Sequence, residues 1–248
     1  MNEPAIPAAT LILVRESKES APELLMVERA RDMSFAGGAL VFPGGRIDEG
    51  DMRLGQAIGG DHAAARVAAI RETLEETAVP IGLLPLPTAE AARAIQQKLS
   101  ADDGLAEVLR SFGIQLHIDS LTPFSRWVPK LHARRRFDTL FFVAPAPPGE
   151  WIPNAIEREC AGAFWVTAAE VLERDRSGSA KLIFPTRRTL ERLALHSSYE
   201  AIVADARVHP LKPITPWVEE TGGESFITIP EGIGYPVTRE KLEGLWRG

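Results

Sequence analysis

The segment 61–77 constrains the fold most, because its apolar residues recur at the spacing of an α-helix that buries one face. Four of them form a continuous stripe along that face: Ala63, Val67, Ile70 and Leu74. Asp61 stands at the start of the pattern, where its side chain can cap the first turn. The pattern therefore predicts a helix that begins near Asp61 and packs this stripe into a hydrophobic core.

Carboxylates gather on the other side of this predicted helix. Glu72, Glu75 and Glu76 fall one helical turn apart and are expected together on its exposed face. Without a cation, like charges at these spacings repel by about 0.2–0.5 kcal/mol per pair. Mg²⁺ and Mn²⁺ prefer oxygen ligands of this kind, so the acids are candidate metal ligands. The alternative is a solvated face on which Arg71 and Glu75 form an ordinary ion pair.

Other apolar segments predict a sheet flanked by further helices. Strands are expected at about 8–15, 23–29, 122–128, 137–144 and 163–166, with another that runs into Val41-Phe42 and stops at the turn Pro43-Gly44-Gly45. Helices are expected over about 88–112 with a break near 102–104, after the cap residue Thr167, and from Pro185 to about His196. A possible hairpin strand lies at 226–229.

The composition is that of a globular protein, with 248 residues of which 45% are hydrophobic and 25% charged. A single domain with insertions suits this length. The net charge of −6, and a basic run no longer than Arg134–Arg136, argue against a long nucleic acid as partner. The lone Cys160 cannot form an internal disulfide, and the apolar run 8–14 is too short to span a membrane. We expect a cytoplasmic protein without a membrane anchor.

A glycine-rich turn precedes the acidic helix. Glycines at 44 and 45 let the backbone approach a phosphate and offer amide donors to it. Turn and helix together resemble the Nudix box, G-x5-E-x7-R-E-U-x-E-E-x-G-U, in which U is a bulky apolar residue. In this comparison Gly45 is the leading glycine, 71–76 contains the R-E and E-E pairs, and Val79 is the last apolar residue.

The resemblance is interrupted between the turn and the helix. Asp51 stands where the pattern has glutamate, and 19 residues separate it from Arg71 where the pattern has seven. The excess, about 52–61, contains several glycines and is expected to form an inserted loop. Thr73 and Ala78 replace an apolar residue and a glycine of the pattern. The role of Asp51 is therefore open, whereas the helical spacing of R-E-x-x-E-E is kept.

The resemblance implies a diphosphatase that cleaves a pyrophosphate linkage in a nucleotide-containing small molecule. It implies that Glu72, Glu75 and Glu76, with Gly45, bind Mg²⁺ or Mn²⁺, and that Arg71 orients the acids. The attacking water also needs a general base. The candidates are Glu72 itself and two acids before the strand at 163–166, Glu157 and Glu159.

The implied fold is of the α/β (α+β) class, a mixed β-sheet sandwiched between α-helices, and the alternation of strands and helices supports it independently. The Nudix domain is expected over 1–205, with insertions at about 52–61 and 85–120. The remaining residues, 206–248, are expected to form a C-terminal extension that packs on the domain or on the partner subunit of a homodimer.

A second pattern narrows the substrate. The residues that resemble the signature of coenzyme A diphosphatases within this superfamily are Arg29-Ala30, Gly38, Phe42–Gly45 and Asp48. Met26 and Val27 depart from that signature, and Ser34 stands where a second arginine belongs. The interrupted box and the segment 127–142 resemble the peroxisomal branch of these enzymes. This likeness implies hydrolysis of coenzyme A or its thioesters to 3',5'-ADP and a 4'-phosphopantetheine product.

Cationic and aromatic side chains are the expected substrate contacts. A guanidinium can bind phosphate through two hydrogen bonds, although surface ion pairs are an alternative role for the same arginines. The candidate phosphate contacts are Arg29, the backbone of Gly44, Arg135 and Arg136. Trp127 or Phe137 can stack on an adenine, although aromatic residues beside strands more often fill a core.

Two other functions remain open at this point. One is an enzyme of the same family that acts on ADP-ribose, a dinucleoside polyphosphate or a nucleoside triphosphate. The other is a non-catalytic Nudix-like module that binds a nucleotide. Retention of Arg71 together with Glu72 and Glu76 favours an enzyme over the binding module.

Overall fold

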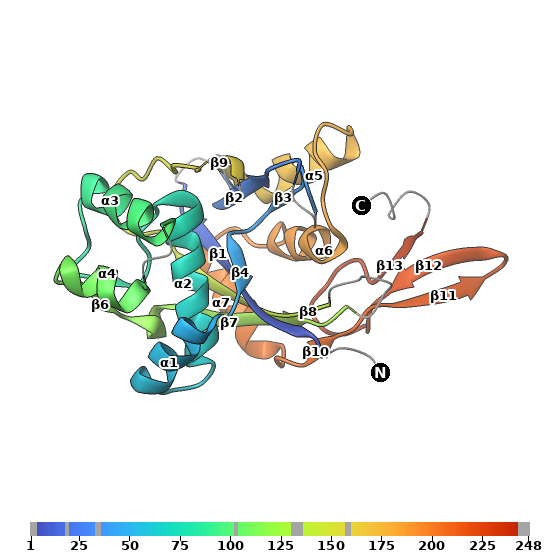
Figure 1. The fold of residues 1–248 in the computed structure, drawn as a ribbon. Coiled ribbons are helices and arrows are strands. Elements are labelled where there is room, and N and C mark those ends of the chain that lie inside the picture. Colours follow the sequence, from blue (N-terminus) through green and yellow to red (C-terminus); the bar gives the residue numbers. More distant parts are fainter. Residues whose placement is uncertain are drawn as a thin grey trace.

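The computed structural model describes residues 4–17, 20–32, 36–101, 104–129, 136–156 and 160–242. At its centre lies an eight-stranded mixed sheet (Figure 1). Its strands are β1 (Ile6–Arg15), β2 (Glu23–Arg29), β3 (Leu40–Val41), β4 (Gly44–Arg46), β7 (Thr122–Trp127), β8 (Phe137–Pro145), β9 (Cys160–Thr167) and β10 (Pro213–Ile214). The path is β10-β7-β8-β1-β2-β3, while β4 pairs with β1 and β9 pairs with β2. The strands expected from the apolar runs are all present.

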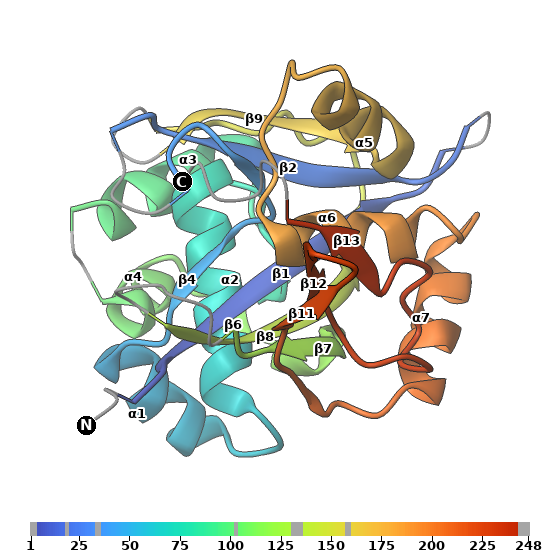
Figure 2. The ribbon, with the colours of Figure 1, turned by 90° about the vertical axis from the view of Figure 1, so that its right-hand side faces the viewer.

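Helices cover both faces of this sheet, as Figures 1 and 2 show from two directions. One face carries α1 (Glu49–Ile58), α2 (Ala63–Thr77), α3 (Ala89–Leu99) and α4 (Leu105–Ser111), with the short elements β5 (Leu83–Leu84), β6 (Gln115–Leu116) and η1 (Ile118–Ser120). The other face carries α5 (Ala168–Arg176), α6 (Phe184–Leu193) and α7 (Tyr199–Val208). The expected mixed sheet between helices is confirmed, whereas α7 was not predicted from the sequence. Within the described ranges, no helix combines the length and the apolar character that crossing a membrane requires.

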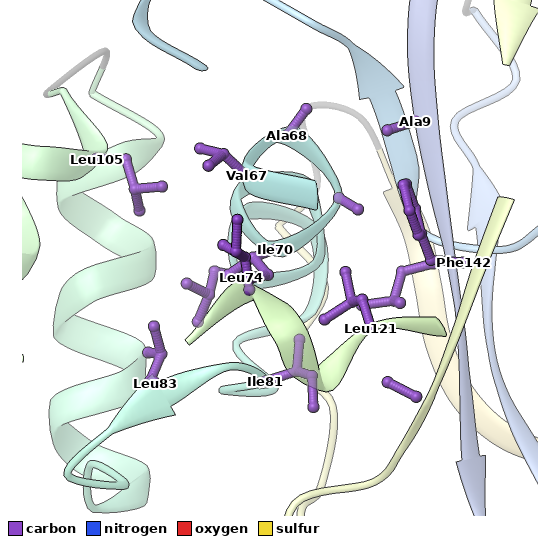
Figure 3. Close-up of a cluster of buried hydrophobic side chains, with 14 of the residues drawn as sticks. Ala9, Val67, Ala68, Ile70, Leu74, Ile81, Leu83, Leu105, Leu121 and Phe142 are labelled. Atoms are coloured by element: carbon purple, nitrogen blue, oxygen red, sulfur yellow. The ribbon is translucent and has the colours of Figure 1, made fainter. Parts of the chain in front are cut away.

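Strand β1 contributes to a hydrophobic core on each side of the sheet. Because alternate residues of a strand point to opposite faces, Leu11 and Leu13 pack in the core of α2, while Ile12 and Val14 pack in the core of α6. Figure 3 shows the α2 core, in which Val67, Ile70 and Leu74 meet residues of the sheet and of α4. The apolar stripe predicted for this helix is confirmed, since its residues are all buried.

The start of α2 differs from the prediction. The N-cap residue is His62, in the left-handed backbone region with φ of 57°, and it has no side-chain cap bond. Asp61 instead accepts a hydrogen bond at its backbone carbonyl from Nε of Arg66, 3.1 Å away. The prediction of Asp61 as the cap is therefore wrong, because the chain makes its sharp turn one residue later.

The segment 52–61 is largely helical, so the prediction of an inserted loop is wrong. Helix α1 begins at a capping box, in which the side chain of Asp48 accepts from the amide of Asp51 and the side chain of Asp51 accepts from the amide of Asp48. Gly55 lies against α2, where a Cβ would come within 2.4 Å of the backbone nitrogen of Ala64. The glycine that suggested a loop thus allows two helices to touch.

Strands β4 and β2 pair with different parts of the same edge of β1, while β8 occupies its other edge. β2 pairs with β1 at Val14 and Arg15, while β4 pairs antiparallel with β1 at 8–10. The sequence predicted a turn at 43–45, but Gly44–Arg46 is a strand. A Cβ at Gly44 would lie 2.5 Å from the carbonyl oxygen of Ala9, so the close strand approach depends on glycine.

The C-terminal residues form a small antiparallel sheet that projects from the body in Figure 1. Its strands are β11 (Trp217–Thr221), β12 (Glu224–Thr228) and β13 (Arg239–Lys241). The hairpin strand expected at 226–229 corresponds to β12. Ile227, Ile229 and Tyr235 are buried in the core of α6, and β10 pairs with β7, so this region is joined to the body at several points.

Candidate active site

A cavity of about 510 Å³ opens where α2, β4, β8 and the start of α6 meet. One part of its lining is acidic and comes from α2 and the β4–α1 segment, including Glu72, Glu76 and Asp48. The opposite part is apolar and comes from β7, β8 and α6, including Phe137 and Pro185. The cavity therefore combines a carboxylate-rich region with an apolar region.

Two glycines place the backbone of β4 directly against the carboxylates of α2. The amide of Gly44 donates to Oε2 of Glu76 over 3.1 Å. A Cβ at Gly45 would come within 2.2 Å of Oε1 of Glu72, so a side chain there would displace the carboxylate. Because β4 covers this face, Glu72 is only 9% exposed and Glu76 only 6%. The prediction that the acids lie on an exposed face is wrong in this respect.

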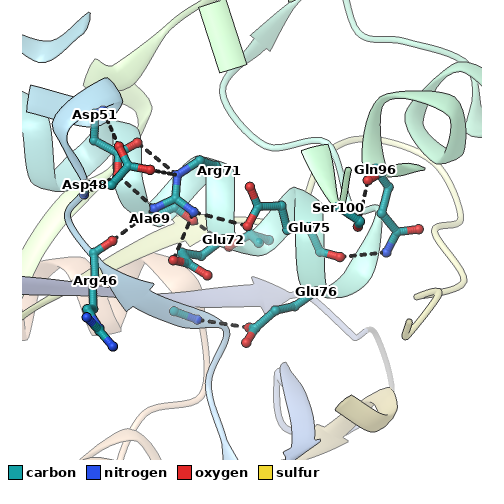
Figure 4. Close-up of polar contacts among 12 residues, drawn as sticks. Arg46, Asp48, Asp51, Ala69, Arg71, Glu72, Glu75, Glu76, Gln96 and Ser100 are labelled. Atoms are coloured by element: carbon teal, nitrogen blue, oxygen red, sulfur yellow. Dashed lines mark hydrogen bonds and ion pairs between the residues drawn. The ribbon is translucent and has the colours of Figure 1, made fainter. Parts of the chain in front are cut away.

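Arg71 lies at the centre of the acidic cluster (Figure 4). Its guanidinium contacts Asp51 at 2.8 Å, Glu72 at 3.0 Å and Glu75 at 3.1 Å. It also donates to the backbone carbonyl of Arg46 over 2.9 Å. The predicted pair of Arg71 with Glu75 is present, but it is one contact of several. Arg71 thus ties the start of α1 to β4 and to the acids of α2.

Asp51 is the residue that stands at the glutamate position of the box. It is 1% exposed, completes the capping box of α1 by accepting from the amide of Asp48, and binds Arg71 through both carboxylate oxygens. It is not among the residues that line the cavity. Its contacts therefore give it a role in holding Arg71 and the β4–α1 segment.

The cluster contains more buried acid than Arg71 can neutralise. Burial raises the pKa of Glu75 to about 8, against the opposing effect of Arg71, and the charge of Glu72 adds to the rise. Burial also raises the pKa of Asp51, despite its hydrogen bonds from Arg71. Burial alone would lower the pKa of Arg71, but the bond to Asp51 and the charges of Glu72 and Glu75 raise it. A further cation would offset the excess negative charge.

The chemistry of these donors suits a hard divalent ion. Glu72, Glu75 and Glu76 offer carboxylate oxygens, and the absent side chain of Gly45 lets the carboxylate of Glu72 lie directly against the backbone of β4. Among the described residues, no three acidic, histidine or cysteine side chains already converge as a metal site. Glu72 and Glu75 instead face Arg71, so binding of an ion requires these carboxylates to turn away from the guanidinium.

The predicted substrate contacts have different positions. Arg29, at the end of β2, lines the cavity, as does the half-buried Phe137. Arg136 precedes β8 and is not among the lining residues. Trp127 also lines the cavity, but it is 1% exposed and its indole N–H donates to the hydroxyl of Tyr235 over 3.1 Å. The predicted site residues that lie outside the described ranges are Arg135, Glu157 and Glu159, and so does Ser34, which replaces an arginine of the signature.

Sequence reasoning missed a buried amide pair at the end of α2. The side-chain amide of Gln96 donates to the carbonyl of Glu75 over 2.9 Å and to that of Asn154 over 2.7 Å (Figure 4 shows the contact with Glu75). The side-chain amide of Asn154 donates back to Gln96 over 2.8 Å, and its backbone amide donates to Thr77. The available signal was a glutamine beside the apolar stripe of α3, which predicts a buried polar contact but not its partner.

Comparison with known proteins agrees with the motif and the fold. No family model matches the chain. It is 25% identical over 224 residues to a Caenorhabditis elegans protein that carries the provisional name nudix hydrolase 7, which covers 89% of this chain and 70% of that protein. The crystal structure of a NUDIX hydrolase from Alicyclobacillus acidocaldarius superposes with a TM-score of 0.71 at 27% identity, covering 81% of this chain and 96% of that one. The chain has the same fold as this hydrolase, and the backbone of its β4 glycines packs against the acids of α2. It is therefore an enzyme of the Nudix hydrolase superfamily, of the diphosphatase type.

Proposed function

We propose that this enzyme hydrolyses the pyrophosphate bond of coenzyme A or an acyl-coenzyme A, giving 3',5'-ADP and the corresponding 4'-phosphopantetheine. One observation carries the proposal. Residues of the coenzyme A diphosphatase-like pattern, including Arg29, Phe42 and Asp48, line the same cavity as Glu72 and Glu76. The pattern and the acids are therefore parts of one site in space, although they are separate in sequence.

The site is proposed to work with Mg²⁺ or Mn²⁺, held by Glu72, Glu75 and Glu76 together with the backbone of Gly45. When bound, the ion supplies charge neutralisation for the diphosphate and lowers the pKa of a coordinated water. The fit rests on the all-oxygen donor set and on the buried negative charge that Arg71 leaves uncompensated.

The protein's own groups then have separate roles. The Gly44 amide fixes the carboxylate of Glu76, and Arg71 aligns α2 with the start of α1 through Asp51. Glu72, which lines the cavity, is the candidate base that accepts a proton from the attacking water. The water oxygen bonds to one phosphorus, the bond from that phosphorus to the bridging oxygen breaks, and the bridging oxygen leaves with the other phosphate. Glu157 and Glu159 remain alternative bases.

The test is turnover by purified protein in Mg²⁺, with coenzyme A, ADP-ribose and a nucleoside triphosphate supplied separately and the products separated by chromatography. Release of 3',5'-ADP from coenzyme A by the wild type, with loss of turnover in Glu76→Gln, is the expected result. Glu90→Gln, an exposed glutamate of α3, is the matched control and should keep full activity.

Each other outcome points to a different function. Cleavage of ADP-ribose or the triphosphate without cleavage of coenzyme A would overturn the proposed substrate and keep the enzyme class. Metal-dependent turnover that survives in Glu76→Gln would remove Glu76 from the mechanism. No turnover of any substrate, with nucleotide binding intact, would favour the non-catalytic binding module.

A further inference from the structure

Helix α6 begins at the wall of the cavity, opposite the acids. Its N-cap residue is Ile183, which offers no side-chain cap, and Ile183, Pro185 and Thr186 all line the cavity. The helix has ten residues, so the partial positive charge of its first turn is fully developed. Its uncapped end therefore faces a space that is large enough to hold a ligand.

The first turn of α6 presents a small set of hydrogen-bond donors. Pro185 has no amide proton, and the amides of Phe184 and Thr186 donate to no described residue. The amide of Arg187 begins the helical pattern by donating to the carbonyl of Ile183 over 3.0 Å. Unpaired amides at a helix start are normally satisfied by a cap, by water or by an anion.

Thr186 is the second, independent indication of a ligand. Its side chain is almost fully buried, with the residue 3% exposed, and yet it lines the cavity. Its hydroxyl makes no hydrogen bond to the residues that the structure describes, and it is not among the fully enclosed unpaired polar atoms, so it is accessible from the cavity. The hydroxyl and amide of Thr186 belong to the cavity wall, and the amide of Phe184 lies in the same first turn. These three donors suit the terminal oxygens of a phosphate monoester.

The position of this helix start is fixed relative to Arg29. The amide of Leu40 donates to the carbonyl of Lys181 over 2.9 Å, just before α6, and the amide of Arg29 donates to the carbonyl of Ala39 over 3.0 Å. These bonds join the approach to α6 to β3 and to the end of β2. A lining arginine and a helix N-terminus thus belong to one rigid part of the cavity wall, on elements other than those that carry Glu72 and Glu76.

We propose that the N-terminus of α6, with the hydroxyl of Thr186, is a subsite for a phosphate monoester that the substrate carries apart from its diphosphate. This subsite rests on the proposed function, because coenzyme A has such a group on its ribose and ADP-ribose does not. The subsite selects nucleoside bisphosphate substrates over their dephosphorylated analogues.

The test compares coenzyme A with dephospho-coenzyme A, which lacks only this phosphate. A hydrogen bond to a charged group contributes enough to change kcat/KM by about tenfold or more. The wild type should therefore prefer coenzyme A, and Thr186→Val should lower the ratio of the two kcat/KM values by about that factor. Thr186→Ser, which keeps the hydroxyl, should restore the ratio.

Thr189→Val is the matched control on the same helix. Thr189 is fully buried and its enclosed hydroxyl is unpaired, but it does not line the cavity, so its replacement should leave the ratio unchanged. If Thr186→Val and Thr189→Val both keep the wild-type ratio while coenzyme A is cleaved, the subsite is wrong and the proposed function stands.

A binding measurement decides the subsite even if coenzyme A is not a substrate. Calorimetry without metal should give tighter binding of 3',5'-ADP than of 5'-AMP to the wild type, and Thr186→Val should lose the difference. Absence of coenzyme A cleavage together with this preference would overturn the proposed function alone. Equal affinities of the wild type for the two nucleotides would overturn the subsite, whatever the variants do.

Discussion

Replacing Gln96 by leucine tests how α3 holds the acidic helix. The change keeps the size of the side chain but removes three hydrogen bonds, two donated by Gln96 and one that it accepts from Asn154. The carbonyl of Glu75 belongs to the last turn of α2, where helix carbonyls lack a partner within the helix. Leucine therefore leaves this carbonyl and two groups of Asn154 unpaired in the interior.

The magnitude follows from these three groups. Each unpaired buried group costs about 1–3 kcal/mol. Burial of the leucine side chain returns about 1.5–3 kcal/mol. Taking the middle of both ranges, we expect the free energy of unfolding to fall by roughly 4 kcal/mol in Gln96→Leu. Because Glu75 is held through its backbone, we also expect a higher Mg²⁺ concentration for half-maximal activity.

Denaturation in urea, followed by circular dichroism, measures the first effect, and titration of activity with Mg²⁺ measures the second. Gln97→Leu is the control, since Gln97 is the exposed neighbour on the same helix. The reasoning is refuted if Gln96→Leu loses no more stability than Gln97→Leu. A stability loss without any change in Mg²⁺ dependence would restrict the amide pair to a structural role.

Three further predictions concern the site and its support. Gly45→Ala should reduce kcat strongly, because its methyl group would displace Glu72. Gly162→Ala is the control and should keep activity, because its methyl group would meet no atom within 4 Å; steady-state kinetics of both variants tests the difference. Arg192→Met should lower the free energy of unfolding by about 3–5 kcal/mol because it leaves Asp205 without its 2.7 Å ion pair, and urea denaturation measures the loss. A chelator should abolish turnover and added Mg²⁺ should restore it, whereas the melting temperature should change little because neither hydrophobic core includes the proposed metal ligands. Retained turnover would contradict the proposed metal.

Local periodicity predicted the elements that carry the site. The stripe of α2 and the apolar runs of β1, β2 and β8 each follow from residues near in sequence, and the structure confirms them. The same reasoning failed for α1, where glycines suggested a loop although the capping pair Asp48 and Asp51 was present in the sequence. The capping pair predicts a helix start, but the glycines were taken as the stronger sign of a loop.

Contacts between distant segments were beyond local patterns. A helical projection places Glu72 and Glu76 opposite the apolar stripe, but it does not show that β4 covers them. The pairing of Gln96 with Asn154 joins residues 58 positions apart. The sequence likewise does not show that the start of α6 lines the cavity, so its hydrogen-bond donors could not be predicted as part of the site.

The segment that contains α1 and its connection to α2 offers a site for inserting a tag into this enzyme. Its first turn belongs to the site through Asp48 and Asp51, but its far end is a helix length away, roughly 15 Å for ten residues. At that end Gly59 and Gly60 have positive φ and no atom within 4 Å of where a Cβ would lie. A fluorescent reporter or affinity tag spliced between these glycines should leave the acids in register, because the contact of Gly55 with Ala64 anchors this segment to α2 before the splice point.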